Sequence, residues 1–459
     1  MKFKIKRSLI FIFALAIILL CLPVLADEPL ETNPTGTDLL IVYPDVPKEF
    51  TLDAAVSWAL EHNNALENLR LELEAARSGL SGAKLMYCPS LDFNGMTQAV
   101  GPASSMNLNL GGNPIDIQLT TNEFIETASV TLTQPVYTFG TIELAVESAE
   151  LRLKQANFQY ERMKETISRD VEKTFLNAAL TEALLDVANG AVGTAEERLR
   201  IANVKFDNGT AAKFEVLRSE VALANRKEEL IQAQTASDLT HSALAQKLGL
   251  PLGSDVSISP PSPDDIVPAP PSFTLLEAQL SAIGNRKDLK ALETAIDLSG
   301  VNVGTKRNRP KLFLQGSYSY SDEPRQLSGD RVGWSVFLNF SYNLFDSGRS
   351  GKSVDQASAS RDALKAQLEE TRTLVALEVE SAYHALSDAI NNIEVSSATL
   401  ESAREALRIA EIGYSEGVIT YIDYQDADLG LRQADSFRLK AIYGYLIAQS
   451  ALKASMGSE

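Results

Sequence analysis

Two stretches of the chain decide its fold: Tyr-Ser-Glu-Gly-Val-Ile-Thr-Tyr-Ile-Asp-Tyr-Gln-Asp-Ala-Asp (residues 414–428) and Phe-Asp-Asn-Gly-Thr-Ala-Ala-Lys-Phe-Glu-Val-Leu-Arg-Ser-Glu (residues 206–220). In each, a long charged run of helical character meets a glycine, Gly209 or Gly417, and a second helical run begins within a few residues. Glycine suits the left-handed position that ends a helix because it has no Cβ. Each stretch therefore predicts a helical hairpin with its turn at the glycine.

Both hairpins carry acid just after the turn. Glu215 follows the first glycine, and Asp423 and Asp426 follow the second. Negative side chains are favoured in the first turn of a helix by the helix dipole. Capping accounts for each of these residues singly, but it does not explain why the chain contains the hairpin twice.

The hairpins belong to an internal duplication with an offset of 208 residues (417 − 209). The same offset aligns Gly140 with Gly348, and Pro89 matches Pro310 after a small gap. A repeat of this length is too long for a solenoid unit, so it predicts two structural halves. The expected organisation is a signal peptide (1–26), a first repeat of helix, two strands and long helical hairpin (27–250), a Pro-rich linker (251–272) and a second repeat (273–459).

The first 26 residues have the features of a secretory signal. Lysines and Arg7 precede an apolar run at 9–20, and Val24-Leu25-Ala26 forms a cleavage site. A lipid anchor at Cys21 is the alternative, although Leu20 stands where a small residue is expected. The full chain has a net charge of −18, and this acidity argues against nucleic acid as a partner.

Four segments alternate apolar and polar residues with a period of two, which predicts two-faced strands. They lie at about 91–99, 128–136, 312–320 and 334–344. Each has roughly the length of a tilted membrane strand. Because four strands cannot close a barrel, either several chains contribute strands or the four form a soluble sheet. Polar loops of unequal length are expected at about 101–121 and 321–331.

Long helices are predicted at 141–207, 211–248, 351–415 and 420–455, and one further helix from Thr51 to about Leu85. A helix of about 65 residues is close to 100 Å long. Apolar residues seven apart predict a coiled-coil seam in both halves. Its members in the first half are Val171, Ala178, Leu185, Val192, Leu199 and Phe206. The equivalent residues in the second half are Val379, Leu386, Ile393, Leu400, Leu407 and Tyr414.

No arrangement of catalytic, cofactor-binding or metal-binding residues emerges from the sequence. The three histidines are scattered over different helices, which argues against a metal or nucleophile cluster. Residues 346–353 approach a phosphate loop but lack its first glycine and its βαβ context. The sequence therefore predicts a protein that is not an enzyme and that takes no cofactor.

Three features, in order along the chain, resemble the TolC-like outer-membrane efflux protein family. They are the helix opening Thr51-Leu52-Asp53-Ala54-Ala55 with Pro89-Ser90-Leu91, the strand end from Gln134 to Gly140 with its copy from Tyr342 to Gly348, and the paired hairpins. The resemblance covers nearly the whole mature chain. Within it, Pro135, Gly140 and Gly348 mark the strand–helix junctions.

The resemblance implies an α-helical protein with a membrane β-barrel. In the family, four strands per chain build a trimeric 12-stranded barrel in the outer membrane, and long antiparallel coiled-coil helices form an α-helical tunnel across the periplasm. The implied function is passive export of small molecules or proteins, in a tripartite efflux or type I secretion system. The implied partners are two further copies in a homotrimer, a periplasmic adaptor (membrane-fusion) protein, an inner-membrane pump or ABC exporter, and outer-membrane lipid.

The resemblance also implies a gate at the hairpin turns. The family's acidic selectivity ring matches Asp423 and Asp426, and its tyrosine-linked latch matches Tyr414 with Glu215. A family arginine two residues after the glycine is Ile419 here. Three copies of the aspartate pair around an axis would concentrate negative charge and attract cations.

Two other functions are consistent with part of the sequence. A secreted coiled-coil scaffold with a structural or adhesive role explains the heptads and the acidity but not the two-faced strands. A general-uptake porin explains the strands but needs no long helices.

Overall fold

The computed structural model describes residues 47, 49–100, 105–110, 113–118, 123–251, 253–254, 256–322 and 332–457. The expected signal peptide (1–26), with Cys21, lies outside the described residues. The described residues divide into two compact units, one within residues 75–153 and 295–363 and the other within residues 47–74, 154–294 and 364–457. Within the described ranges, none of the helices combines the length and the apolar character that a bilayer crossing requires.

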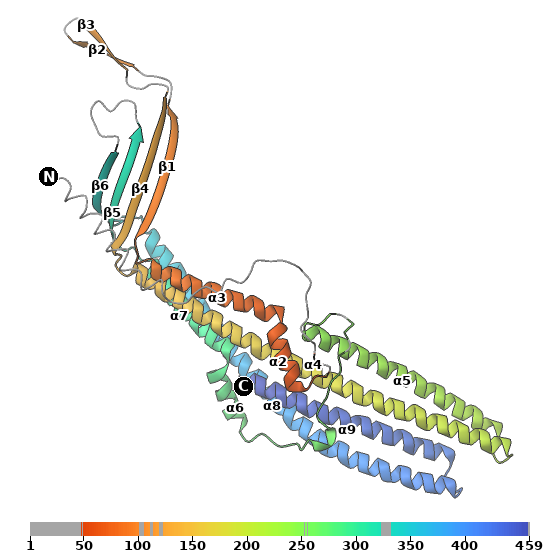
Figure 1. Cartoon of the computed structure of the whole chain (residues 1–459). Coiled ribbons are helices and arrows are strands. Elements are labelled where there is room, and N and C mark those ends of the chain that lie inside the picture. Colours follow the sequence, from red (N-terminus) through yellow and green to blue (C-terminus); the bar gives the residue numbers. More distant parts are fainter. Residues whose placement is uncertain are drawn as a thin grey trace. The chain divides into compact units, whose positions relative to one another are not determined.

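The first unit contains one antiparallel four-stranded sheet in the order β1-β4-β5-β6 (Figure 1). Its strands are β1 (Ser90–Val100), β4 (Glu123–Tyr137), β5 (Lys311–Asp322) and β6 (Val332–Ser341). The pairs Phe93–Val130, Val130–Tyr318 and Leu314–Leu338 lie opposite each other, so the apolar positions of all four strands share one face. The four strands predicted from the period-two pattern are thus confirmed.

A second, two-stranded sheet lies in the segment that was expected to be a polar loop. It pairs β2 (Ser105–Leu110) with β3 (Asn113–Gln118), and Leu110 lies opposite Asn113. The expectation of a plain loop at 101–121 is therefore wrong. The sequence carries the signal, because Gly111-Gly112 separates two alternating runs, which is typical of a hairpin.

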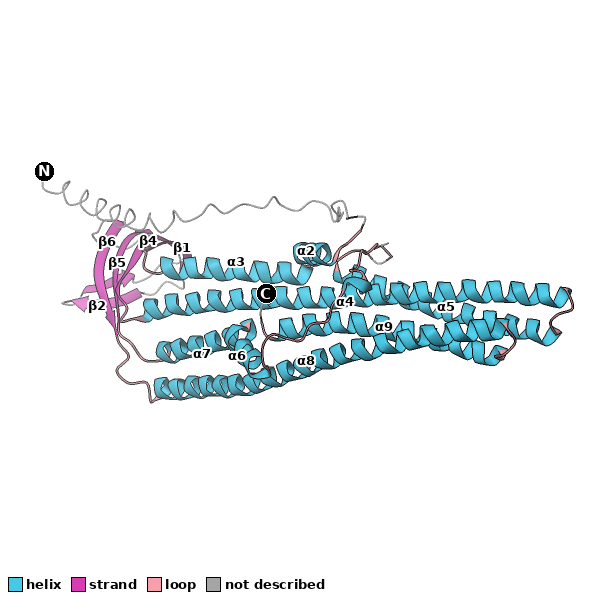
Figure 2. Ribbon diagram, turned by 90° about the horizontal axis from the view of Figure 1, so that it is seen from below, coloured by secondary structure: helices cyan, strands magenta, loops and turns pink. Residues whose placement is uncertain are grey.

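Four long helices follow the strands, close to the predicted bounds. They are α4 (Thr141–Asp207), α5 (Lys213–Lys247), α8 (Arg349–Ser415) and α9 (Tyr421–Ser455). In the second unit they run side by side (Figure 2). In the second half the seam is buried over most of its length, because Val379, Leu386, Ile393 and Leu400 are at most 8% exposed, whereas Leu407 and Tyr414 near the turn are half-buried. In the first half only Val171 and Ala178 are fully buried, whereas Leu185, Val192 and Leu199 are half-buried and Phe206 is exposed, so the predicted seam is only partly buried in this half.

The predicted single helix at 51–85 is wrong, because it breaks at Asn63 into α2 (Leu52–His62) and α3 (Asn64–Leu85). Asn63 has a ψ of 117°, which is extended rather than helical. Its side-chain oxygen accepts a hydrogen bond from the backbone N–H of Ala65 at 2.9 Å, so the side chain caps the new helix start. The second half has the matching pair α6 (Leu275–Asn285) and α7 (Lys287–Thr305).

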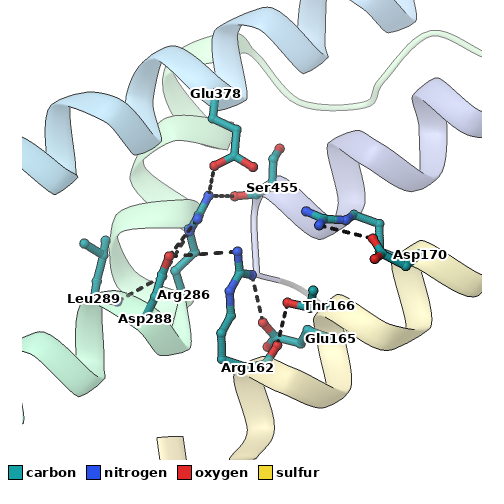
Figure 3. A network of polar contacts seen from close by, with 10 residues as sticks. Arg162, Glu165, Thr166, Asp170, Arg286, Asp288, Leu289, Glu378 and Ser455 are labelled. Carbon is teal, nitrogen blue, oxygen red and sulfur yellow. Dashed lines mark hydrogen bonds and ion pairs between the residues drawn. The ribbon is translucent and has the colours of Figure 1, made fainter. Parts of the chain in front are cut away.

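A buried arginine joins three helices of the second half (Figure 3). Arg286, at the start of α7, is 4% exposed and pairs with Asp288 at 2.7 Å and with Glu378 of α8 at 2.6 Å. It also donates to the carbonyl of Ser455, the last residue of α9, at 3.4 Å. Burial alone would raise the pKa of Asp288, but the hydrogen bond and charge of Arg286 outweigh it and lower that pKa. The network thus holds the end of α9 to the start of α7.

Candidate functional site

The two hairpin turns are built as the glycines predicted. Gly209 has a φ of 73° and Gly417 a φ of 72°, in the left-handed region. In the first turn the N–H of Thr210 donates to the carbonyl of Lys205 at 2.8 Å, and in the second the N–H of Val418 donates to the carbonyl of Gly413 at 2.8 Å. These bonds satisfy the last carbonyls of α4 and α8 and return the chain along α5 and α9.

Tyr414 and Glu215 meet between the two hairpins, as the resemblance implied. The phenol of Tyr414, near the end of α8, donates to Oε1 of Glu215 in α5 at 2.9 Å. The ring of Tyr414 stacks on Tyr424, with centroids 5.4 Å apart and planes within 4°. Burial, then the hydrogen bond and charge of Glu215, raise the pKa of Tyr414 to about 12. The phenol is therefore a donor at any physiological pH.

A buried ion pair beside this contact also joins the hairpins. Arg198 of α4 donates to both oxygens of Asp428 in α9, at 2.8 and 3.1 Å, and to the hydroxyl of Tyr424 at 3.0 Å. Arg432, one turn further along α9, contacts the same carboxylate. Asp428 is 6% exposed, so burial alone would raise its pKa, but the hydrogen bonds and charges of Arg198 and Arg432 outweigh it and lower the pKa.

The sequence reasoning missed Arg198, Tyr424, Asp428 and Arg432. A signal was present: Arg198 lies eleven residues before Gly209, and Asp428 lies eleven residues after Gly417. In helices that run alongside each other, residues equally far from their turns lie at a similar level. Opposite charges at such positions are candidates for a pair between hairpins.

Arg198, Glu215, Tyr414 and Tyr424 line a cavity of about 300 Å³ between the hairpins. Three tyrosines contribute to it, and each has a cation over its ring. Arg198 lies 4.7 Å from the centroid of Tyr424, Lys205 5.3 Å from that of Tyr414, and Arg218 5.2 Å from that of Tyr421. Such contacts stabilise by about 0.5–1 kcal/mol each at exposed sites and by more when desolvated. The two hairpins are thus held together by hydrogen bonds, an ion pair and ring contacts.

Asp423 and Asp426 lie outside this cluster. Both are exposed on the first two turns of α9, and neither lines the cavity. The Asp423 carboxylate accepts from the hydroxyl of Thr420 at 2.6 Å, and Thr420 accepts from the N–H of Asp423 at 3.3 Å. This capping box means that Asp423 stabilises the helix start whatever further role it has.

Ile419, at the position where the resemblance implies an arginine, has an apolar side chain. It packs so closely on α8 that a Cβ added at Gly413 would come within 2.6 Å of it. Ile409, Ile412 and Val418 complete an apolar hollow with it. This position therefore contributes apolar packing on α8.

The strand–helix junctions are shaped by Pro135, Gly140 and Gly348. The pairing of β4 with β5 shifts by one residue between Pro135 and Tyr137. Gly140 (φ 85°) and Gly348 (φ 81°) are both left-handed. A Cβ at Gly140 would lie 2.5 Å from the guanidinium of Arg309, which donates to the Phe139 carbonyl. Glycine is needed there for conformation and for space.

The sequence as a whole matches the family model "Outer membrane efflux protein" over residues 55–250 and 280–458. The chain belongs to the outer membrane efflux protein family. Like the family, it is an outer-membrane protein that extends into the periplasm and serves as an efflux channel. The duplicated helices, the four-stranded sheet and the paired turns are this family's architecture.

Curated relatives match most of the chain at low identity. Nodulation protein T of Rhizobium leguminosarum bv. trifolii is 24% identical over 70% of this chain and 69% of its own length. Outer membrane protein OprJ of Pseudomonas aeruginosa is 25% identical over 83% of this chain and 79% of its own. The cobalt-zinc-cadmium resistance protein CzcC of Cupriavidus metallidurans is 22% identical over 87% and 88%.

Solved structures share the fold. The structure of CusC superposes with a TM-score of 0.73 and 17% identity, covering 91% of this chain and 96% of that one. The Campylobacter jejuni CmeC outer membrane channel gives a TM-score of 0.70 and 18% identity, covering 88% and 85%. At these identities the comparison establishes the fold and no residue's role.

Proposed function

We propose that three copies of the chain form one passive export duct through the outer membrane, completed by a periplasmic adaptor and an inner-membrane pump or ABC exporter. The exported molecules are small compounds or proteins, as in tripartite efflux and type I secretion. In this assembly the chain performs no chemistry. Its sheet contributes four of twelve strands, and its long helices contribute to the periplasmic tunnel.

The apolar face of the sheet supports contact with lipid. Trp334, Phe340 and Phe93 are 67%, 63% and 73% exposed. Monomeric soluble proteins rarely expose a continuous apolar surface of this kind. A bilayer covers such a face at no cost in hydrogen bonds, provided that the strand edges are also paired.

The contacts between the hairpins support a gate, and the pair of Arg198 and Asp428 carries that part of the proposal. In a duct lined by hairpins, passage requires the turns to separate. Arg198–Asp428 and Tyr414–Glu215 both oppose that separation, because each joins one hairpin to the other. The proposed latch is therefore these two contacts together, with Tyr424 between them.

A trimer would contain two kinds of groove between hairpins, one within each copy and one between neighbouring copies. The latch residues are suited to closing only the groove within a copy. With the offset of 208 residues, the position equivalent to Arg198 is Ala406, and the position equivalent to Asp428 is Glu220. A groove between the second hairpin of one copy and the first hairpin of the next would thus lack the arginine. The proposed latch closes the groove within each copy.

Asp423 and Asp426 are proposed as the selectivity ring. Both are exposed, and they are one helical turn apart on α9. Six carboxylates around a narrow axis would attract cations and repel anions.

Conductance of the purified chain in planar bilayers tests the proposal. We expect a trimer that forms ion-conducting pores with a low basal conductance. Its mass should be near three times that of the mature chain, which is smaller than the 49.9 kDa of the full sequence because the expected signal peptide has been removed. A monomer that remains soluble without detergent and forms no pores would overturn the duct.

A further inference from the structure

A basic segment lies where the second half of the sheet begins. Between the end of α7 and the start of β5, residues 305–311 read Thr-Lys-Arg-Asn-Arg-Pro-Lys, with four cations and no acid. The matching prolines, Pro89 and Pro310, fix an offset of 221 residues (310 − 89) at this point. The equivalent residues of the first half, 84–90, read Lys-Leu-Met-Tyr-Cys-Pro-Ser and hold one cation. The two halves of an acidic chain therefore differ most plainly in charge at the base of the sheet.

Two of the four cations have a role within the fold. Arg309 donates to the Phe139 carbonyl at 2.6 Å. Lys311 begins β5 on the polar face of the sheet, which it shares with Gln315. The other two, Lys306 and Arg307, are exposed, and none of the ion pairs in the described part of the chain includes either of them. The helix dipole favours cations at the end of α7, but it does not require two side by side.

A third cation, Arg349, lies where the helix dipole opposes it. It is the first residue of α8, whose first turn contains no acid, whereas the equivalent helix α4 has Glu143 in its first turn. A cation at a helix N-terminus is unfavourable because the free N–H groups carry partial positive charge. Asp346 caps this helix start by accepting from the N–H groups of Gly348 and Ser350, at 2.9 and 2.8 Å. Arg349 is therefore not needed to form the helix.

Exposed apolar side chains lie beside these cations. Leu344 and Phe345, between β6 and α8, are 88% and 83% exposed, more than any other large apolar side chain in the described part of the chain. The side-chain amide of Asn308, the neighbour of Arg307, donates to the carbonyl of Asn343, the neighbour of Leu344. This bond holds the basic segment against the apolar one, where α7 ends and α8 begins below the strands (Figure 2).

Cations next to exposed apolar side chains match the chemistry of an anionic phospholipid. Lysine and arginine form charge-assisted hydrogen bonds to a phosphate. The acyl chains beside that phosphate cover apolar side chains that would otherwise meet water. Basic residues close to a bilayer surface attract anionic lipids. Because the long helices extend into the periplasm, the strand ends that adjoin them belong to the periplasmic leaflet.

We propose that Lys306, Arg307 and Arg349 bind the headgroup phosphate of an anionic phospholipid in the periplasmic leaflet, with its acyl chains against Leu344 and Phe345. This inference rests on the proposed contact of the sheet with lipid and adds the class of lipid. The site belongs to the second half alone. At the equivalent place in the first half, exposed Met86 and Tyr87 offer apolar contact without the charges.

Native mass spectrometry of the full chain tests the site, because it reports both the oligomer and the lipids that remain bound to it. The protein in detergent is mixed with equal amounts of dioleoyl phosphatidylglycerol and dioleoyl phosphatidylethanolamine, which share their acyl chains and differ in net charge. Trimers that retain phosphatidylglycerol in preference, up to about one per copy, are expected. Lys306→Gln with Arg307→Gln should lower the ratio of bound phosphatidylglycerol to phosphatidylethanolamine by about fivefold or more. Arg349→Gln, a second and independent variant, should lower it as well.

The chain offers matched controls of both signs. Arg226→Gln with Lys227→Gln removes the same two charges from α5, where the side chains pair with Glu229 and Glu196, and should leave the lipid ratio unchanged. Met86→Arg places a cation at the position equivalent to Arg307 and should raise the ratio. Glycerol phosphate, the soluble headgroup, should not displace phosphatidylglycerol, because it lacks the acyl chains.

The outcomes separate the site from the proposed duct. A lower ratio in Lys306→Gln with Arg307→Gln, and not in its control, supports the site. An equal fall in both variants would show a general effect of net charge and overturn it. Displacement by glycerol phosphate would identify a site for free anions and overturn the choice of lipid. A trimer that retains the two lipids equally overturns the site and leaves the duct standing, whereas a monomer that retains neither lipid overturns both.

Discussion

Arg198 in α4 holds Asp428 in α9 by two hydrogen bonds of 2.8 and 3.1 Å, across 230 residues of sequence. The side chains are 17% and 9% exposed, so this is a buried pair. A buried pair contributes little against an apolar substitute, but removal of one partner is strongly destabilising because it strands the other charge. The pair therefore makes separation of the two hairpins costly.

Replacement of Arg198 should open the proposed gate. Arg198→Ala leaves Asp428 with Arg432 alone and removes the only described bridge from that carboxylate to α4. Because Arg432 still pairs with Asp428, the loss is that of hydrogen bonds to a charged group, about 2 kcal/mol, which corresponds to a shift of about 30-fold in the equilibrium between closed and open turns. Basal single-channel conductance in planar bilayers, or the fraction of time spent open, should rise accordingly.

Arg200→Ala is the matched control for this variant. Arg200 lies two residues along the same helix. Among the residues that the structure describes, its ion pair is with Glu197 one turn earlier, and both side chains are more than half exposed. An exposed pair within one helix contributes a few tenths of a kcal/mol. Equal conductance in the two variants would remove Arg198 from the latch.

Loss of the Tyr414 hydroxyl should have a smaller effect in the same direction. Tyr414→Phe keeps the stack on Tyr424 and removes the hydrogen bond to Glu215. A hydrogen bond to a charged group is worth about 1.5 kcal/mol or somewhat more, so basal conductance should rise about tenfold. Tyr383→Phe, which removes a bond to the Phe273 carbonyl away from the turns, serves as the control. A flat response in Tyr414→Phe would mean that Tyr414 contributes packing alone.

The latch should resist mild acid and fail in strong acid. The pKa of Asp428 is lowered in the folded protein. The stability that the ionised Asp428 gives to the closed latch is therefore complete above the ordinary pKa of an aspartate and is lost as the pH falls through the lowered pKa. Conductance should therefore stay low at pH 5 and rise below about pH 4.

Asp428→Asn tests whether this acid response belongs to Asp428. The variant should conduct ions at neutral pH and should lose most of the rise in conductance that acid causes.

On the alkaline side, the hydrogen bond from Tyr414 should persist. The pKa of the Tyr414 phenol is raised to about 12, so the bond is fully present below the ordinary tyrosine pKa of 10.0 and is lost only as the pH rises through the raised pKa. Opening between pH 9 and 10 would contradict this assignment.

Removal of the exposed acids of α9 should change ion selectivity. Asp423→Ala with Asp426→Ala takes away six carboxylates from the proposed ring of a trimer, so block of the conductance by divalent or trivalent cations should weaken. Because Asp423 also caps α9, Asp423→Ser with Asp426→Asn provides a second variant with less damage to the helix start. Unchanged block in both variants would remove the ring assignment.

The Arg286 network predicts a stability effect without a gating effect. Arg286→Met takes the shared cation from the carboxylates of Asp288 and Glu378, whose side chains are 31% and 44% exposed, so we expect a cost of about 1.5–3 kcal/mol. The midpoint of thermal unfolding, followed by circular dichroism in detergent, should fall by several degrees. Lys352→Met, which removes an ion pair whose side chains are 87% and 67% exposed, should leave the midpoint unchanged.

Much of the fold could be predicted from local patterns. Period-two segments, heptads and left-handed glycines each depend on residues close in sequence, so the strands, the long helices and the turns at Gly209 and Gly417 were found within a few residues. The break at Asn63 was missed because a single side chain's bond to the backbone outweighed the helical pattern around it. The β2–β3 hairpin was missed although Gly111-Gly112 signalled it.

The sequence by itself determined the duplication, the two-faced strands and the helical hairpins, because periodicity and glycine conformation are local properties of the chain. Only the tertiary structure decided that Arg198 meets Asp428, that Tyr424 lies between them and Tyr414, and that Asp423 caps its own helix while lying outside that cluster. Those facts depend on which faces of α4 and α9 turn toward each other. The rotation of each helix about its own axis decides which face meets its neighbour. It is set by the packing of whole helices, and no short stretch of sequence encodes it.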